Sequence, residues 1–246
     1  MNNKLLIIFL ICITAVAVVL SFKFKQKQVG GQNAQPRPDK FTSPLKTKPV
    51  IDYNNIDKNE ELKALMQERK AKYGIEKGVD IVTKADESFK IGDATVSMQE
   101  ILDKINLKRG NIIEKDLRTN DTNSYGKTEL FGIYVVHQED NIWNIHFKLL
   151  KDYFDHKGVN LTPLADEPLD NGISSGIGKL LKFSENTVNI YNLKERKLDA
   201  NLSLIFPLSK IVVYNMNQVF ALLDLIDYKN VNGIHFDGET LWIPAN

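Results

Sequence analysis

The sequence has a single cysteine among its 246 residues, and this scarcity excludes several kinds of protein. Cys12 lies within an apolar run near the amino terminus, so the rest of the chain can form neither a disulfide framework nor a cysteine-ligated metal site. Thiol catalysis is excluded for the same reason. A nucleophile in this protein would have to be serine, threonine, lysine or a carboxylate.

The chain also lacks a strong net charge, which is +1 at pH 7. Residues 1–50 carry eight Lys or Arg against Asp39 alone, whereas residues 51–246 carry 24 basic and 30 acidic side chains. The larger part of the chain is therefore mildly acidic. Because neutralising nucleic-acid phosphates needs clustered positive charge on the folded surface, we expect no nucleic-acid partner.

Catalytic and metal-binding motifs are missing as well. The four histidines are not spaced as in HExxH, and no nucleophile-elbow sequence occurs. Asp152 and His156 lie one helical turn apart and could hold a metal or sense pH, but a solvent-facing contact is the simpler interpretation. Asp166 and Glu167, beside Pro168, are interpreted as loop acids. We expect a protein that is not an enzyme and has no metal or cofactor.

Long apolar runs are also absent, with one exception. Residues 5–22 contain no charge, and a helix of eighteen residues spans about 27 Å, close to the hydrocarbon thickness of a bilayer. We expect residues 1–22 to be an uncleaved membrane anchor, since the run ends in Lys23, Lys25 and Lys27. The alternative is a signal peptide cleaved near residue 17 or 21. These lysines would, by the positive-inside rule alone, leave the rest of the chain in the cytoplasm.

The remaining chain, 43% hydrophobic and 26% charged overall, has the composition of a globular protein. Residues 23–56 are rich in Gln, Gly, Lys and Pro, have few large apolar side chains, and are predicted to form a flexible tether. Residues 119–126 (TNDTNSYG) have the composition of an exposed linker. They mark a second predicted domain boundary.

Between these segments, residues 57–118 are predicted to form a short helix and a small α+β module. Asp57 and Glu60 suit a capping box that opens the helix. In the module, β-rich residues 79–82 precede a hairpin that turns at residues 92–93, and Ser97 caps a helix. The acids of the module, Asp86, Glu87 and Asp93, are interpreted as turn and surface residues.

Residues 131–216 contain two strands and two helices by pattern. Residues 133–137 are predicted as a strand, and Asp140 as the N-cap of an amphipathic helix that ends at Gly158. A second helix is expected from Ser184 to Leu193, and a β-branched strand at residues 211–214. Residues 158–182, rich in Pro and Gly, are predicted to be a surface loop between the helices. In residues 217–246 we expect a helix at 218–226 and a hairpin that turns at Asp237-Gly238.

This βααβ order resembles the lysin motif, or LysM domain. The residues that carry the resemblance are Tyr134-Val135-Val136, Asp140, Ile142-Trp143, Ile145, Ile190-Tyr191-Asn192-Leu193, Asn201, Leu204-Ile205-Phe206-Pro207 and Lys210-Ile211-Val212-Val213. Three features depart from the family: Glu139 in place of a turn glycine, Leu208-Ser209 after the proline, and the insert of residues 158–182. The implied fold class is α+β, with a transmembrane helix, a hairpin-plus-helix module, the LysM-like domain and a C-terminal helix and hairpin.

LysM domains bind polymers that contain N-acetylglucosamine, chiefly peptidoglycan, in a shallow groove between the loop after the first strand and the loop before the last. The resemblance therefore implies a ligand-binding site with a polar side and an apolar side. These residues are Gln138, Glu139, Asp140 and Asn141 on the polar side and Leu204, Ile205 and Phe206 on the apolar side.

Two functions remain open at this point. The first is a non-catalytic bacterial envelope protein, anchored in the inner membrane by residues 5–22, that binds peptidoglycan or a related N-acetylglucosamine polymer. The second is an envelope assembly or scaffold module whose LysM-like domain, through residues 158–182, binds a protein partner. Both require export, so we expect a single-pass protein with the bulk of the chain in the periplasm.

Overall fold

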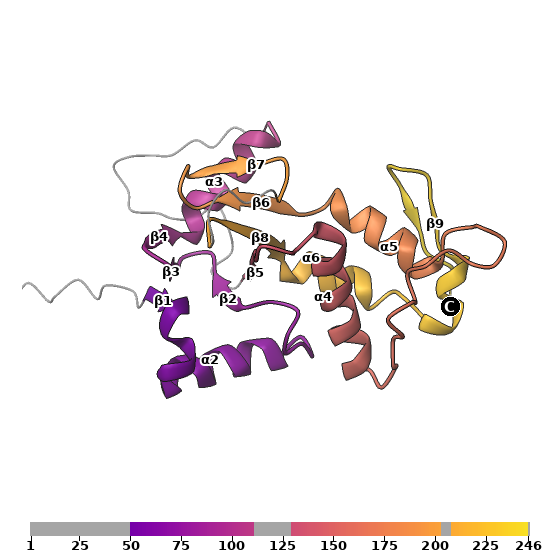
Figure 1. Ribbon diagram of the computed structural model, residues 1–246, viewed down its shortest axis with the longest axis horizontal. Helices are drawn as coiled ribbons and strands as arrows, with labels where there is room; N and C mark the ends of the chain where they lie inside the picture. Colours follow the sequence, from indigo (N-terminus) through magenta and orange to yellow (C-terminus); the bar gives the residue numbers. More distant parts are fainter. Residues whose placement is uncertain (1–49, 111–128, 203–207, 246) are drawn as a thin grey trace, which may run out of the picture. The chain divides into compact units, whose positions relative to one another are not determined.

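The computed structural model describes residues 50–110, 129–202 and 208–245. These residues all belong to one compact unit, Thr47–Asn246, and a second unit, Met1–Lys46, lies outside the described residues. The described part of the chain is an α+β structure, as predicted (Figure 1).

Five antiparallel strands form the central sheet, in the order β2–β5–β8–β6–β7. Their bounds are β2 (Ile81–Lys84), β5 (Leu130–Val135), β6 (Asn189–Asn192), β7 (Lys197–Asp199) and β8 (Lys210–Asn215). The pairing of β5 with β8 runs from Phe131 opposite Asn215 to Val135 opposite Ile211. Both strands are hydrogen-bonded on each side, so they form the interior of the sheet.

Both faces of the sheet are buried at the inner strands β5 and β8, where successive side chains point to opposite sides. In β5, Leu130 and Tyr134 belong to one hydrophobic cluster, whereas Phe131 and Ile133 belong to the other. A nearly continuous apolar sequence, as in β5 and β8, is typical of strands that are covered on both faces.

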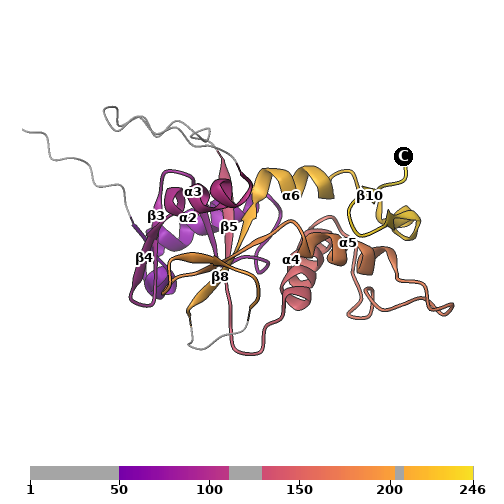
Figure 2. The ribbon, with the colours of Figure 1, turned by 90° about the horizontal axis from the view of Figure 1, so that it is seen from above.

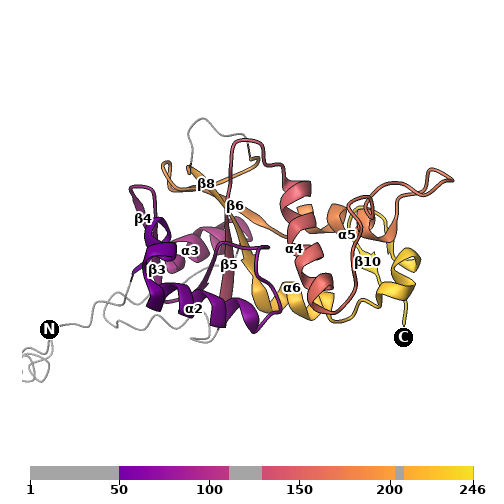
Figure 3. The same cartoon turned by 60° about the horizontal axis from the view of Figure 1, so that its bottom comes forward.

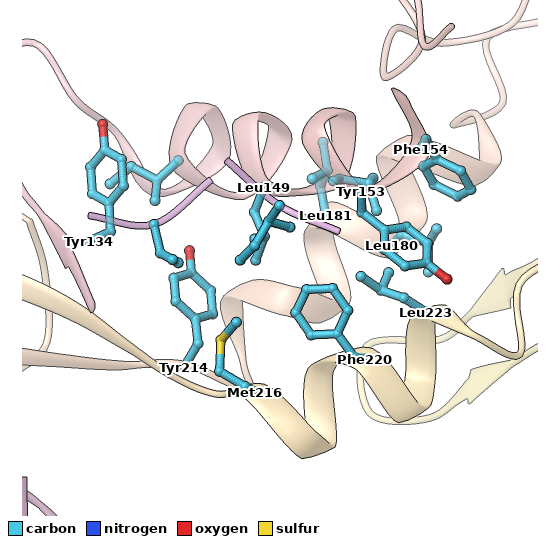
Figure 4. Packing of buried hydrophobic residues seen from close by; sticks show 14 of the residues in the cluster. Tyr134, Leu149, Tyr153, Phe154, Leu180, Leu181, Tyr214, Met216, Phe220 and Leu223 are labelled. Atoms are coloured by element: carbon cyan, nitrogen blue, oxygen red, sulfur yellow. The ribbon is translucent and has the colours of Figure 1, made fainter. Parts of the chain in front are cut away.

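Three helices cover the first face: α4 (Ile142–His156), α5 (Gly176–Glu185) and α6 (Met216–Leu223). Tyr214 of β8 and Phe220 of α6 point toward Leu149 and Tyr153 of α4 (Figure 4). The start of α6 lies close to the sheet at Gly132, where a Cβ atom would be 2.6 Å from Met216 Sδ.

The second face is covered by a small sheet and two helices (Figure 2). The sheet has the order β1–β3–β4, with bounds β1 (Val50–Asp52), β3 (Ser88–Ile91) and β4 (Ala94–Ser97). The helices are α2 (Glu60–Ala71) and α3 (Met98–Lys108), and a 3-10 helix, η1 (Tyr53–Lys58), precedes α2. Arg69 of α2 ties this layer to β2 and the following turn, since it donates to Val82 O at 2.8 Å and pairs with Glu87 at 2.7 Å.

Several predicted elements are confirmed. The predicted first strand, first helix and closing strand of the LysM-like domain correspond to β5, α4 and β8. The predicted hairpin is β3–β4, whose turn residue Gly92 has a φ of +55°. Ser97 caps α3 by accepting from Glu100 N at 3.2 Å. The C-terminal helix and hairpin are α6 and the pair β9 (His235–Phe236) and β10 (Leu241–Trp242), with a 3-10 helix, η2 (Tyr228–Gly233), between them.

The second predicted helix is wrong. Residues 189–192 form strand β6, and the second helix is α5, which begins at Gly176 inside the segment predicted as a loop. Ser184 does not cap a helix there; its hydroxyl donates to Leu180 O at 2.8 Å within α5. β-branched Val188 and Ile190 favour an extended strand, and β8 is available beside them to complete it.

Residues 158–182 are also not a detachable surface loop. Leu161 is fully buried in the first cluster, and Ile177, Leu180 and Leu181 of α5 belong to the same cluster. The Asp166 carboxylate accepts from the indole N–H of Trp143 on α4. Replacing this segment by a flexible linker would therefore remove part of the core.

Two predicted caps are corrected as well. The N-cap of α4 is Asn141, whose side chain accepts from Asn144 N at 2.8 Å, and Asp140 instead closes the turn before it. The N-cap of α2 is Asn59 and not Asp57. In each case an asparagine directly before the helix takes the role that the acid was expected to fill.

The segments predicted as separate domains, residues 57–118 and 131–216, share the central sheet. Strand β2 comes from the first segment and pairs with β5 of the second. The two segments lie in one compact unit, Thr47–Asn246.

Three predicted segments fall partly or wholly outside the described residues: the anchor of residues 1–22, most of the tether, and the linker of residues 119–126. Within the described ranges, no helix has the length and apolar character needed to cross a membrane.

Candidate functional site

A groove of about 740 Å³ opens over the exposed part of strands β6 and β7. The loop between β5 and α4 forms one side, the end of α5 forms a second, and the chain after β7 forms a third. Its amide side chains are Gln138, Asn141, Asn186 and Asn201, and its larger apolar side chains are Ile142, Val188, Ile190 and Leu202. Its charged residues are Lys108, Asp140, Glu185 and Asp199. We call this site the amide groove.

Asp140 holds the loop between β5 and α4 in place. Its carboxylate accepts from His137 N at 2.8 Å and from the Tyr134 hydroxyl at 3.0 Å. Lys148 of α4 lies 3.3 Å from the same carboxylate and donates to the Tyr134 hydroxyl at 2.9 Å. The strand, the turn and the helix are thus joined through one side chain.

The electrostatics of Asp140 follow from these contacts. Partial burial acts to raise its pKa, but the donors from His137 and Tyr134 and the Lys148 ammonium lower it below the usual range. A carboxylate that stays ionised and is already engaged by three neighbours positions the loop and is poorly suited to act as a general acid.

The other predicted residues of this loop have separate places. Gln138 and Asn141 are exposed and line the amide groove, and the Gln138 side chain makes no hydrogen bond to any described residue. Glu139 is exposed and does not line the groove. Among the described residues only Arg196 and Leu208 are non-glycine residues with positive φ, so the Glu139 backbone has no need of glycine.

The chain after β7 is held by a buried lysine. Lys210, which is 5% exposed, lies 2.8 Å from the Asp199 carboxylate and donates to Asn201 O at 3.0 Å. The hydrogen bond and charge of Lys210 lower the pKa of Asp199. Asp199 and Lys210 both lie at strand ends, which fixes their positions. Asn201, which Lys210 contacts, is therefore held in place on this side of the groove.

The floor of the groove is formed by residues that had been predicted, wrongly, to lie in a helix. Ile190 lies opposite Asp199 in the β6–β7 pair and, with Val188, gives the groove an apolar base. Asn186, the C-cap of α5, stands beside them. The β-branched and aromatic residues Val188, Ile190 and Tyr191 are the sequence signal that could have indicated a strand here.

Leu204, Ile205 and Phe206, the predicted apolar side of the site, lie outside the described residues. Of the predicted site residues that are described, Gln138, Asp140 and Asn141 are brought together in the groove and Glu139 is not. The structure adds Asn186, Val188, Ile190 and Asn201, which sequence reasoning did not identify as site residues.

Asp152 and His156, the alternative metal or pH-sensing pair, have different roles. The Asp152 carboxylate accepts from three successive amides, those of Glu76 and Lys77 at 2.6 Å and Gly78 at 2.9 Å. His156 packs against Gly74. Within the described ranges, no cluster of three or more His, Cys, Asp or Glu side chains is suited to hold a metal ion.

The amide groove can thus recognise a neutral, hydrogen-bonding ligand. Side-chain amides donate and accept, so they suit ligands that carry both functions, and the apolar base suits a methyl group or a flat ring face. Asp140 and Asp199 pair with Lys148 and Lys210, so the groove has no excess of positive charge to attract a polyanionic ligand.

Comparison of the chain with protein-family models, with curated proteins and with solved structures gave no match.

Proposed function

We propose that the protein is a non-catalytic envelope protein that binds an N-acetylglucosamine-containing glycan, such as peptidoglycan, in the amide groove. The observation that carries the proposal is the arrangement of four amide side chains around the apolar residues Val188 and Ile190. An N-acetyl group presents one N–H, one carbonyl and one methyl, and this groove offers partners for all three.

The order of elements lends support to the LysM resemblance, which stays a prediction. Strand β5, helices α4 and α5, and strand β8 follow one another as strand, helix, helix and strand, and β5 pairs antiparallel with β8. The hairpin β6–β7 stands between α5 and β8, where the family has none. The proposed groove lies beside the loop after β5, as the resemblance implies.

The location is part of the proposal. The uncharged run of residues 5–22 would anchor the chain in the inner membrane, with the bulk of it in the periplasm. Binding would then occur to the glycan strands that lie next to the membrane. A cytoplasmic reporter enzyme fused after Asn246 should be inactive, and strong activity would contradict the proposed location.

Retention on insoluble peptidoglycan tests glycan binding. The full-length protein in detergent should co-sediment with peptidoglycan and with chitin, and the retention should survive moderate salt because hydrogen bonds and apolar contacts carry it. Gln138→Ala combined with Asn186→Ala should reduce retention about tenfold, since each removes an exposed amide of the groove. The control pair Asn160→Ala with Gln218→Ala changes exposed amides elsewhere. Equal retention of both pairs would contradict the proposal.

A second function, binding of a protein partner through residues 158–182, is favoured by a separate observation. Leu164, Leu169 and Ile173 are 65%, 40% and 54% exposed, on a segment that buried Leu161 and Asp166 fix to the core. Exposed apolar side chains on a rigid support are typical of protein interaction sites.

Site-specific cross-linking distinguishes this second function from glycan binding. A photo-reactive residue at Leu169 should cross-link to a discrete partner in the producing cell, whereas the same residue at Leu107, which is 77% exposed on α3, should not. A variant with serine at Leu164 and Ile173, and the photo-reactive residue still at position 169, should lose the cross-link and keep its retention on peptidoglycan. Identical patterns at positions 169 and 107 would exclude the insert as a partner site.

A further inference from the structure

A second cavity, of about 490 Å³, differs from the amide groove in the residues that line it. It is bounded by η1, by α2, by the turn that follows α2 and by His156 at the end of α4. Figure 3 shows α2 and this turn beside α4. Ile56, Met66, Ala71 and Ile75 give it a mainly apolar lining, and we call it the lysine pocket after Lys70.

Lys70 is one of two partly buried lysines in this lining, the other being Lys63. The Lys70 side chain is half-buried, and its ammonium donates to the backbone carbonyl of Glu76 at 3.2 Å. Within the described residues no carboxylate lies within 4.0 Å of it. Burial lowers the pKa of Lys70, and the more distant Asp80, Asp152 and Asp57 oppose this effect only in part.

The charges at the mouth of the pocket differ from the charge inside it. Asp57 and Glu76 are exposed residues, whereas Lys63 and Lys70 are partly buried. Water therefore screens the acids more strongly than the lysines. An anion that entered the pocket would meet an ammonium that has lost part of its hydration and has a neutral carbonyl as its partner.

The walls of the pocket are fixed before any ligand binds. Gly74, with a φ of +63°, lets the chain turn directly against His156, where a Cβ atom would lie 2.2 Å from the imidazole. The Asp152 carboxylate then holds the amides of the next residues, Glu76, Lys77 and Gly78. A preformed apolar cavity with one convergent polar group is the usual form of a small-molecule site.

We propose that the lysine pocket binds a small amphiphilic carboxylate, with its anionic head on the Lys70 ammonium and its apolar chain against Met66 and Ile75. The site is independent of the amide groove and of the proposed glycan binding. It adds a small-molecule ligand to a protein whose other proposed ligand is a polymer.

Three probes of equal chain length test the head-group preference: hexanoate, hexanol and hexylamine, titrated calorimetrically into the full-length protein in detergent. Hexanoate should bind most tightly and hexylamine should not bind. Lys70→Met keeps an unbranched side chain that is one atom shorter and removes its charge, so it should weaken hexanoate binding roughly tenfold or more and leave hexanol binding nearly unchanged. Lys151→Met, which removes a lysine that pairs with Asp155 outside the pocket, is the matched control.

The pKa of Lys70 provides a second test. It would not respond to the ligand if Lys70 had only a structural role. With the lysines carrying ¹³C-methyl labels, the pKa of Lys70 should rise when hexanoate is added and stay constant with hexanol.

Ala71→Trp should block the pocket at its exposed side, abolishing hexanoate binding even if Lys70→Met does not fold. The proposal is overturned if hexanoate does not bind at millimolar concentrations, if hexylamine binds equally well, or if the pKa of Lys70 does not respond. Gln138→Ala with Asn186→Ala should leave hexanoate binding unchanged, so that failure of one proposal is separate from failure of the other.

Discussion

At the scale of single residues, His146 shows how burial of a titratable group links stability to pH. It is 3% exposed, its Nδ1 lies 3.0 Å from the Tyr214 hydroxyl, and its Nε2 has no hydrogen-bond partner in the described structure. A cavity of about 40 Å³ beside it is lined by Leu149, Leu181 and other uncharged residues. Burial lowers the pKa of His146 to about 4. The folded protein therefore holds the neutral imidazole.

This pKa predicts acid destabilisation with a defined range. The unfolded chain binds the proton near pH 6.5, so the contribution of His146 to stability falls as the pH drops from about 6.5 to about 4, by about 3 kcal/mol in all. Urea unfolding at pH 7 and pH 4.5 measures this loss. The variant His146→Leu should lose less stability between these two pH values than the wild type. Equal losses in both proteins would show that other groups dominate.

Asp152 gives a second prediction at this scale. Its carboxylate accepts three backbone amides of the turn after α2, so Asp152→Ala should destabilise the protein by about 2–3 kcal/mol. Asp152→Asn keeps an acceptor oxygen and should cost less. Asp155→Ala, on the same helix, removes only an exposed ion pair with Lys151 and should cost less than about 1 kcal/mol. The ranking can be measured as midpoints of urea unfolding, and a reversed ranking would contradict the assigned role.

At the scale of elements, the contact between α5 and η2 depends on the absence of a side chain. Gly176 opens α5, and a Cβ atom there would lie 1.9 Å from Val231 O, while its amide donates to the Asn232 side chain at 3.1 Å. The backbone of η2 thus approaches the helix as closely as glycine allows. This contact holds one side of the segment that the sequence had indicated to be a free loop.

Gly176→Ala should therefore move η2 away from α5 and lower the free energy of unfolding by about 2–4 kcal/mol, because backbone atoms cannot yield as a flexible side chain can. Gly110→Ala is the control. Gly110 has a φ of +75° and open space around it, so alanine there should cost only about 1–2 kcal/mol of backbone strain. Thermal unfolding followed by circular dichroism measures both. A cost at Gly176 no larger than at Gly110 would mean that η2 is loosely attached.

Elements also explain what could be predicted and what could not. Where local signals agreed, as in Ser97 before α3 or Gly92 within its hairpin, the sequence was sufficient. The helix predicted for residues 184–193 was wrong because apolar residues in a short segment fit a helix and a strand alike. These residues form a strand because they pair with β8, which is distant from them in the sequence. The groove floor was missed for the same reason, whereas Gln138 and Asn141, which line the groove, had been indicated by the resemblance to LysM domains.

At the scale of the whole molecule, the shared sheet means that residues 129–246 are not expected to fold alone. Without residues 50–110, strand β5 loses its partner β2, and Phe131, Ile133 and Val213 lose the layer that covers them. A fragment of residues 129–246 should therefore show no cooperative unfolding, whereas residues 47–246 should unfold in one transition. Calorimetry of the two fragments tests this. A sharp transition in the shorter fragment would restore the two-domain interpretation.

The pairing of β5 with β8 has a consequence for the rate of folding. Phe131 and Asn215 are neighbours in the sheet but roughly eighty residues apart in the chain, and contacts between distant segments slow folding to milliseconds or longer. During synthesis, neither face of the sheet can be covered fully until β8 has left the ribosome. The chain would then remain incompletely folded through most of its translation.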